Sequence, residues 1–213
     1  MEIPKYYRSE FETWIVKLYD FSFRLASLGK DHQLRHVIAK NISNKSKRIL
    51  DMATGTGEVA EEIKRHHPST EVIGIDLSKQ MLSIAKTKAK KEGLNIKYLR
   101  KNIENTNLKQ NSFDAVTISF AMHEVPHKNR LNIINEAYRL LKKGGKFIIM
   151  DFSKSESWFM RLFMNSHLNF LEPKYAKEIL TESFSEELKR NKFNKVKHKI
   201  HFNGIVQLVT GVK

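Results

Sequence analysis

Apolar residues near the start of the chain recur three or four positions apart, the spacing of one face of a helix. They fall in two stretches: Phe11, Trp14, Ile15, Leu18 and Tyr19, then Leu34, Val37 and Ile38. We therefore expect a helical N-terminal arm over residues 1–45.

From residue 46 onward, short apolar runs alternate with longer amphipathic stretches. The runs predict strands at 48–53, 71–76, 96–100, 113–119 and 146–152, and the stretches predict helices at 57–66, 78–92 and 127–142. Ser78 is a natural helix N-cap, and Gly93 and Gly144 are natural helix stops. Strands that alternate with helices predict a doubly wound, mostly parallel sheet of the α/β class, with helices on both faces.

The alternation ends after Asp151. Residues 153–180 are rich in aromatic side chains and Met at helical spacing, which predicts a helical insertion that can form a lid. Its apolar stripe at 158–170 suits a packed core as well as a substrate wall. After a helix at 183–191, two apolar runs flank Asn203-Gly204, which predicts an antiparallel hairpin. The expected fold is one domain, 1–213, with a seven-stranded sheet.

The composition is that of a globular protein, with 40% hydrophobic and 29% charged residues. Cysteine is absent, which excludes disulfides and thiolate metal sites and suits a reducing cytoplasm. The first ten residues lack the apolar core of a signal peptide, and no apolar run approaches the roughly 18 residues of a membrane span. We expect a cytoplasmic protein.

The net charge of 38 − 23 = +15 invites a nucleic-acid or anionic-membrane partner. The lysines, however, are scattered through every segment, and no block of arginines is interleaved with aromatic residues. We therefore favour a lysine-rich composition as the origin of the charge, and do not expect specific nucleic-acid binding.

The segment RILDMATGTGEVAEEI, residues 48–63, carries the main chemical signal. A strand leads into a loop with Gly55 and Gly57, which allow positive φ angles and close approach of a ligand to the backbone. The next strand ends at Asp76, 21 residues beyond Gly55. An acid at this distance lies beside the loop in a βαβ unit and can accept hydrogen bonds from ribose hydroxyls, which predicts a nucleoside cofactor.

Two cofactor classes compete at this loop. Gly55-x-Gly57-x-x-Ala60 also satisfies the dinucleotide pattern. Asp51 precedes the glycines, and its charge would repel a pyrophosphate but attract a sulfonium or an ammonium group. Alternatively, Asp51 serves only to cap backbone N–H groups of the loop.

The pattern Asp51-x-Ala53-x-Gly55-x-Gly57 resembles the first motif of class I S-adenosylmethionine-dependent methyltransferases, with Ala in place of the first glycine. Three further segments are similar to family motifs: VIGIDLSKQMLSIAK, NSFDAVTISFAMHEV and EAYRLLKKGGKFIIMDFSK. The ATGTG loop, the ISF stretch and the closing FNGIVQL are most similar to the ubiquinone/menaquinone biosynthesis C-methyltransferases. The resemblance implies the Rossmann-like fold of that class.

The resemblance also implies a binding set for S-adenosyl-L-methionine and its product S-adenosyl-L-homocysteine. The family usually has Asp where this chain has Asn102, whose uncharged carbonyl can still accept from the adenine amino group. The implied contacts are Asp51, Ala53, Gly55 and Gly57 to methionine, Asp76 to ribose, Leu77 and Met81 beside adenine, Asn102 and Ile103 after the third strand, and Ser119 and Phe120 beneath the methionine end.

Three residues are candidates for catalysis. His123 and Glu124 stand where the quinone family tends to have Arg and Asn, and together they could remove a proton from an acidic nucleophile. They could equally tie down a loop. Tyr19 resembles a family tyrosine that closes over the site, although a core aromatic residue would show the same spacing. No cluster with metal-ligand spacing and no Ser-His-Asp signature is found, so we expect no metal.

The implied reaction is an in-line displacement of methyl from the sulfonium onto a nucleophile, with the protein supplying mainly proximity and alignment. The favoured acceptor is a small apolar molecule, such as a membrane-derived quinone precursor methylated on a ring carbon. The alternatives are an RNA or protein methyltransferase, an NAD-type oxidoreductase and a non-catalytic S-adenosylmethionine-binding protein.

Overall fold

The fold was analysed in a computed structural model of the 213-residue chain. The structure describes residues 3–4, 6–7, 31–153 and 183–213. Most of the expected N-terminal arm, with Tyr19, and almost all of the expected insertion therefore lie outside the described residues. The chain divides into two compact units, 1–103 and 104–213, which are described in turn. The expectation of a single domain stays a prediction.

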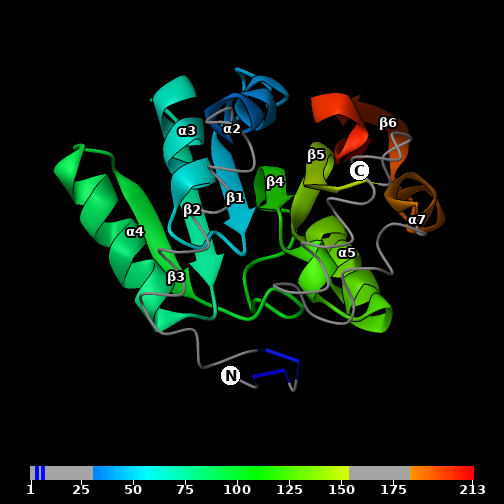
Figure 1. Cartoon of the computed structure of the whole chain (residues 1–213), viewed down its shortest axis with the longest axis horizontal. Helices are drawn as coiled ribbons and strands as arrows, with labels where there is room; N and C mark the ends of the chain where they lie inside the picture. The colour runs from blue at the N-terminus through cyan, green and yellow to red at the C-terminus, as the bar shows by residue number, and fades with distance from the viewer. Residues whose placement is uncertain (1–2, 5, 8–30, 154–182) are drawn as a thin grey trace. The chain divides into compact units, whose positions relative to one another are not determined.

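The described residues of the first unit form a three-stranded parallel sheet with three helices (Figure 1). The strand order is β3-β2-β1, and each strand pairs in register with its neighbour, from Arg48 opposite Glu71 to Asp76 opposite Arg100. The elements are α2 (Asp31–Lys40), β1 (Arg48–Met52), α3 (Glu58–His66), β2 (Glu71–Asp76), α4 (Lys79–Lys91) and β3 (Ile96–Arg100).

Apolar side chains of these elements are almost fully buried. Ile49 of β1, Ile73 of β2 and Leu34 of α2 are exposed by 2% or less, as the spacing of apolar residues predicts. The Ser78 side chain accepts a hydrogen bond from the backbone N–H of Met81 and so caps α4. The sequence therefore predicts both the core and the start of this helix correctly.

Within residues 104–153 and 183–213, the second unit has four strands in the order β4-β5-β7-β6. β4 pairs with β5 in parallel, whereas β7 pairs antiparallel with both β5 and β6. The elements are β4 (Phe113–Ser119), the 3-10 turn η1 (Met122–Glu124), α5 (His127–Leu140), β5 (Leu141–Phe152), α7 (Phe184–Arg190), β6 (Asn194–His201), the 3-10 turn η3 (Phe202–Gly204) and β7 (Val206–Val212). The predicted antiparallel hairpin at the C-terminus is confirmed.

One boundary differs from the sequence prediction. The helix expected at 127–142 ends at Leu140, and Leu141 already has the extended backbone of β5. Lys142 and Lys143 fit a helical pattern, but Leu141 pairs with Phe113 of β4, and this tertiary pairing draws the backbone into the strand. With this adjustment, the predicted fold class is confirmed: a mixed seven-stranded sheet, mostly parallel, with an antiparallel C-terminal pair.

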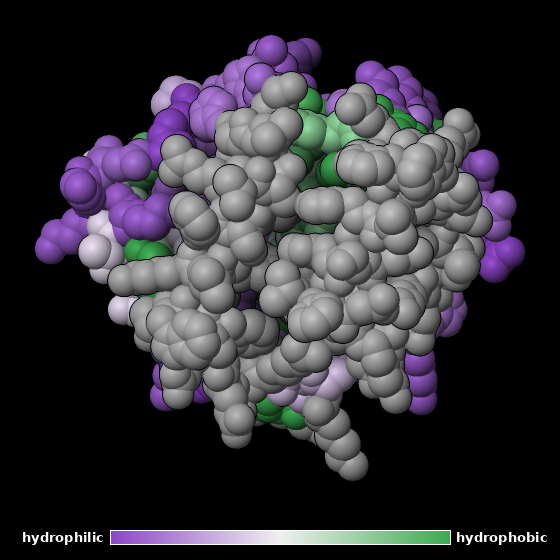
Figure 2. Space-filling model, in the orientation of Figure 1, coloured by the Kyte–Doolittle hydropathy of each residue, from purple (hydrophilic) through white to green (hydrophobic). Residues whose placement is uncertain are grey.

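The surface of the described residues is mostly polar. Figure 2 shows hydrophilic side chains along much of the outline of the molecule. Among the described residues, only Ile3 and Ile200 are large hydrophobic side chains that are well exposed, at 47% and 49%. None of the helices in the described ranges is long and apolar enough to span a membrane.

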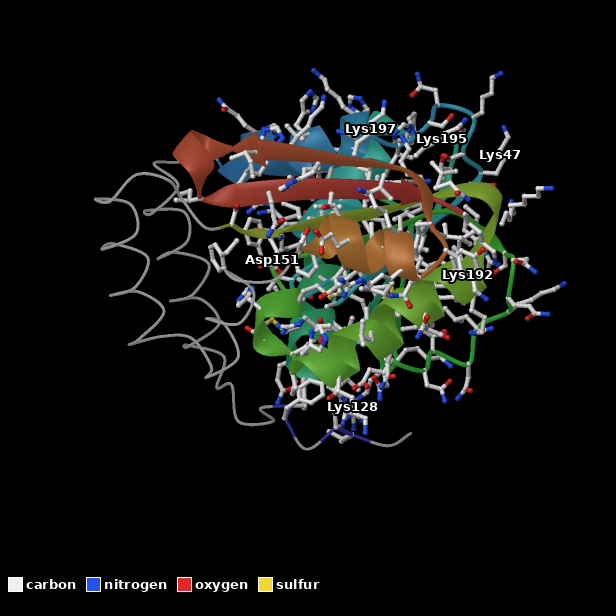
Figure 3. The ribbon with its side chains drawn as sticks, turned by 90° about the vertical axis from the view of Figure 1, so that its right-hand side faces the viewer. Lys47, Lys128, Asp151, Lys192, Lys195 and Lys197 are labelled. Atoms are coloured by element: carbon white, nitrogen blue, oxygen red, sulfur yellow. The ribbon has the colours of Figure 1, made fainter. Side chains whose placement is uncertain are left out.

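Lysines line the edge strand β6. Lys195, Lys197 and Lys199 are all exposed, and Figure 3 shows Lys195 and Lys197 directed outward. Charged side chains on an edge strand oppose pairing with the edge of another sheet. Part of the positive charge thus has a structural explanation that requires no nucleic acid.

Candidate cofactor and active site

The glycine loop follows β1 directly and turns the chain into α3. Ala53, Gly55 and Gly57 all have positive φ angles, of 52°, 53° and 87°. Alanine is unfavourable in this conformation, yet Ala53 stands at the first glycine position of the motif and adopts the turn that the motif requires. The loop is closed by two backbone hydrogen bonds, from Thr54 to Ile75 and from Gly57 to Thr54, each 2.9 Å long.

The two glycines serve different purposes. A Cβ atom added at Gly55 would meet no protein atom within 4 Å, so a ligand can approach the backbone there. A Cβ atom at Gly57 would lie 2.5 Å from the Tyr98 hydroxyl and 2.9 Å from Ala85 Cβ. Gly55 therefore provides access to the loop, whereas Gly57 allows α3 to pack closely against β3 and α4.

Asp51 lies in β1, just before the glycine loop, and is only 1% exposed. The Thr54 hydroxyl donates a 2.6 Å hydrogen bond to Asp51 Oδ2. This contact favours a role in fixing the loop, which the sequence left open beside a role in ligand attraction. The carboxylate charge still lies at the carboxyl end of β1, where it favours a cation over a pyrophosphate.

Asp76 connects the end of β2 to the glycine loop. Asp76 Oδ2 accepts from the Gly55 N–H at 2.9 Å, and Oδ1 accepts from the Ser78 N–H at 2.8 Å. Burial raises the pKa of Asp76, while the N–H groups of Ser78, Gly55 and Leu77 oppose this rise. Each carboxylate oxygen has a second lone pair, so two ribose hydroxyls can still be bound.

The remaining predicted contacts of this unit lie at the same edge of the sheet. Leu77 follows β2, and its carbonyl accepts a 2.8 Å hydrogen bond from Arg100 Nε at the end of β3. Leu77 and Ile103 are each 8% exposed, whereas Met81 and Asn102 are partly exposed. Apolar walls beside an amide are suited to a purine ring.

In the second unit, β4 ends at Ser119, and Phe120 takes a positive φ of 48°. Ser119 and Phe120 are partly exposed, and the Phe120 ring packs edge-on against Phe152 with centroids 5.4 Å apart. The Phe120 N–H donates to the Met150 carbonyl at 2.8 Å. This bond continues the pairing of β4 with β5 and brings the residues after Ser119 beside Asp151.

His123 pairs with Asp151, a partner that the sequence analysis missed. Both side chains are fully buried, and His123 Nδ1 lies 2.8 Å from Asp151 Oδ1. Asp151 also accepts from the N–H groups of Met122, at 2.9 Å, and Phe152, at 2.7 Å. The sequence suggested Glu124 as the acidic partner, but Glu124 is partly exposed and the structure places Asp151 at the imidazole. Only the pairing of β4 with β5 could have indicated Asp151.

A family comparison identifies the chain. The model of the ubiE/COQ5 methyltransferase family matches residues 6–186. The chain belongs to this family. The resemblance inferred from the glycine loop and the later motifs is thereby confirmed.

Similar proteins of this ubiE/COQ5 family include the demethylmenaquinone methyltransferase of Thermus thermophilus, 35% identical over 139 residues, which are 65% of this chain and 62% of the relative. The ubiquinone/menaquinone biosynthesis C-methyltransferase UbiE of Rickettsia prowazekii is 31% identical over 219 residues, 92% of this chain and 88% of the relative. The matched part covers about 60% of the length of several such relatives, including the one from Thermus.

Solved structures support the same fold. Phosphoethanolamine N-methyltransferase 2 of Haemonchus contortus, in complex with S-adenosyl-L-methionine, has a TM-score of 0.71 at 18% identity, covering 97% of this chain and 58% of that protein. A possible histamine N-methyltransferase of Thermotoga maritima has a TM-score of 0.68 at 18% identity, covering 94% and 100%. This ubiE/COQ5 family member thus has the fold of class I methyltransferases.

Proposed function

We propose that this chain transfers a methyl group from S-adenosyl-L-methionine to a small, apolar, quinone-like acceptor. The observation that carries the proposal is the hydrogen bond from the Gly55 N–H to Asp76. This bond joins the carboxylate that would bind the ribose to a glycine loop that a ligand can approach. Membership of the ubiE/COQ5 family supports the reaction, and the names of the Thermus and Rickettsia relatives support a quinone-like acceptor.

The residues of the first unit suit this cofactor. Asp76 would bind the ribose, the Gly55 backbone would border the methionine end, and Leu77 with Ile103 would enclose the adenine. When bound, S-adenosyl-L-methionine supplies a methyl group on a positively charged sulfur. The anionic Asp51 favours that charge over the pyrophosphate of a dinucleotide.

His123 is the proposed general base. Asp151 holds the Nδ1 side of the imidazole, which leaves Nε2 as the basic nitrogen. Removal of a hydroxyl proton would make a ring carbon of the acceptor nucleophilic, so that a carbon–methyl bond forms as the sulfur–methyl bond breaks. The ring carbon then gives its proton to water, and the hydroxyl oxygen regains a proton from the His123 imidazolium. We propose that the acceptor is a membrane-derived small molecule, and that the reaction takes place in the cytoplasm.

The cofactor assignment can be tested by calorimetry of the full chain with S-adenosyl-L-methionine, S-adenosyl-L-homocysteine and NAD(H). We expect heat from the first two only. A transfer assay with tritiated methyl then compares lipid, RNA and protein fractions, and label should enter the lipid fraction. Tight NAD(H) binding without S-adenosyl-L-methionine binding would refute the cofactor, whereas label in RNA or protein would refute only the acceptor.

The base assignment calls for variants at both members of the buried pair. His123→Gln should lower kcat by about 10²- to 10⁴-fold, abolish the acid limb of the kcat/KM pH profile and leave cofactor affinity within about twofold. Asp151→Asn should also lower kcat, since it disturbs the tautomer of the His123 imidazole. His127→Ala is the control, because that imidazole is half exposed on α5. An acid limb that survives in His123→Gln would assign the proton transfer to another group.

A further inference from the structure

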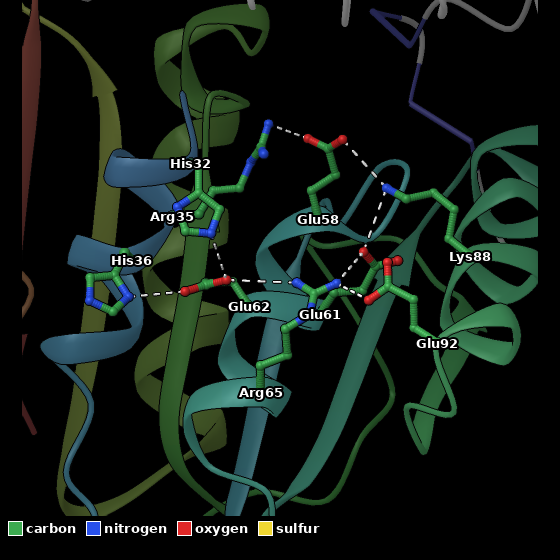
Figure 4. Close-up of polar contacts among 9 residues, drawn as sticks. All are labelled: His32, Arg35, His36, Glu58, Glu61, Glu62, Arg65, Lys88 and Glu92. Carbon is green, nitrogen blue, oxygen red and sulfur yellow. Dashed lines mark hydrogen bonds and ion pairs between the residues drawn. The ribbon is translucent and has the colours of Figure 1, made fainter. Parts of the chain in front are cut away.

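Histidines of α2 and α3 gather around one buried carboxylate in the first unit. His32 and His36 are four residues apart on α2, and Glu62 and His66 are four residues apart on α3, so each pair shares one face of its helix. Figure 4 shows His32 and His36 directed toward Glu62. Glu62 thus has two imidazoles of α2 beside it, with His32 Nε2 3.6 Å from Oε2, and His66 on the same face of α3.

Three of these side chains lie close enough together to hold one metal ion. The ligand atoms of His36, Glu62 and His66 all lie within 4.8 Å of one another, and His36 Nδ1 is 3.0 Å from Glu62 Oε1. Neighbouring ligand atoms about 2.1 Å from a Zn²⁺ ion are roughly 3.0–3.4 Å apart. The His36–Glu62 pair therefore already has the required spacing, and His66 lies on the exposed side of the group.

The donor set selects the type of ion. Two imidazoles and one carboxylate suit Zn²⁺, whereas Ca²⁺ and Mg²⁺ prefer oxygen ligands alone. The Glu62 side chain is only 8% exposed, while that of His36 is 36% exposed. The carboxylate thus forms the floor of the cluster, and water can complete the coordination from the exposed side.

We propose that His36, Glu62 and His66 form a Zn²⁺ site that fastens α2 to α3, with His32 available as a further ligand. The sequence alone predicts no metal here, because the ligands come in two pairs on separate helices, with His36 and Glu62 26 positions apart. The site shares no residue with the proposed methyl-transfer residues and does not depend on that function.

Two neighbouring groups affect the affinity of the site. Arg65 Nη1 lies 3.7 Å from Glu62 Oε2, so its positive charge competes with a cation. Arg65 also pairs with Glu92 and Glu61, which offer this guanidinium other carboxylates when Zn²⁺ binds. His67 is not a ligand, because its Nε2 lies 3.1 Å from the backbone carbonyl of Ala39.

The proposal can be tested on the untagged full chain after removal of metal with a chelator. Titration with Zn²⁺ alone, monitored by calorimetry, should show a site that saturates at one ion per chain. Bound Zn²⁺ should also raise the midpoint temperature of thermal unfolding. His36→Ala, Glu62→Gln and His66→Ala should each weaken binding at least tenfold and reduce the rise in midpoint. His198→Ala should bind as the unaltered chain does, because it removes an exposed histidine of β6.

Two further measurements keep the outcome clear. His66 is exposed, so His66→Ala tests the site without a change in the core, and far-UV circular dichroism verifies the fold of every variant. Arg65→Gln should bind Zn²⁺ several-fold more tightly, because it removes the competing charge. Absence of Zn²⁺ binding, or binding that all three ligand variants retain, would overturn the proposal.

Discussion

Substitutions at the two glycines of the loop should have different effects, one mainly on protein stability and the other mainly on cofactor binding. Both Gly55 and Gly57 have positive φ, and alanine in that conformation costs about 1–2 kcal/mol. Gly57→Ala carries a second cost, since its Cβ would lie 2.5 Å from the Tyr98 hydroxyl oxygen and 3.1 Å from the ring carbon Cζ. Overpacking of this kind costs about 1–3 kcal/mol. We therefore expect Gly57→Ala to lower the free energy of unfolding by about 2–5 kcal/mol.

Gly55→Ala should behave differently. Its Cβ meets no protein atom within 4 Å, so only the backbone cost of about 1–2 kcal/mol applies. The added methyl group lies where the ligand approaches, and S-adenosyl-L-methionine affinity should fall by tenfold or more. Urea unfolding followed by far-UV circular dichroism measures stability, and calorimetry measures cofactor affinity.

Tyr98 provides an internal check. Its hydroxyl is buried and forms no hydrogen bond among the described residues, and burial raises its pKa. Tyr98→Phe alone should therefore change stability by less than about 1 kcal/mol. Combined with Gly57→Ala it should recover about 1 kcal/mol, because the closest contact is removed while that with Ala85 remains. Equal destabilisation by Gly55→Ala and Gly57→Ala, or no recovery in the double variant, would refute this reasoning.

Variants at three other residues test the role of buried or partly buried carboxylates. Asp76→Ala should weaken cofactor binding by about 1.5–3 kcal/mol, and it should also destabilise the fold because it removes the acceptor of the Gly55 N–H. Asp76→Asn should keep most of the stability. Equal melting temperatures of the two variants would contradict this structural role of Asp76. Burial acts to raise the pKa of Glu136, but the hydrogen bonds from Arg139 and Thr106 together outweigh it and lower this pKa. The ionised Glu136 therefore stabilises the fold above pH 4.5, and this stabilisation is lost as pH falls below that value. Glu136→Gln should cost about 1.5–3 kcal/mol at pH 7 and flatten that pH dependence in unfolding experiments. Burial raises the pKa of Glu61, so the contribution of this residue to the free energy of unfolding falls as pH rises above 4.5. Glu61→Gln should therefore melt at a higher temperature than the unaltered chain at pH 7. A lower melting temperature would contradict this direction of the pKa shift.

The sequence alone predicted those features that depend on residues close together along the chain. The alternation of apolar runs and amphipathic stretches determines the α/β class, because strand and helix bury their apolar faces with different periods. The Gly55–Gly57 loop and its 21-residue spacing to Asp76 predicted the link between loop and strand end, because a βαβ unit has nearly constant geometry. Family membership could be inferred from the same residues.

Only the tertiary structure determined which distant residues meet. His123 faces Asp151, 28 residues away, because β4 pairs with β5 so that Ser119 lies opposite Met150. Gly57 is required as glycine because Tyr98 of β3 packs against it, and no local pattern reveals that contact. His36 and Glu62 likewise meet only because α2 packs on α3. Local sequence specifies where each strand and helix forms, but side-chain partners depend on strand register and helix packing, which the whole fold sets.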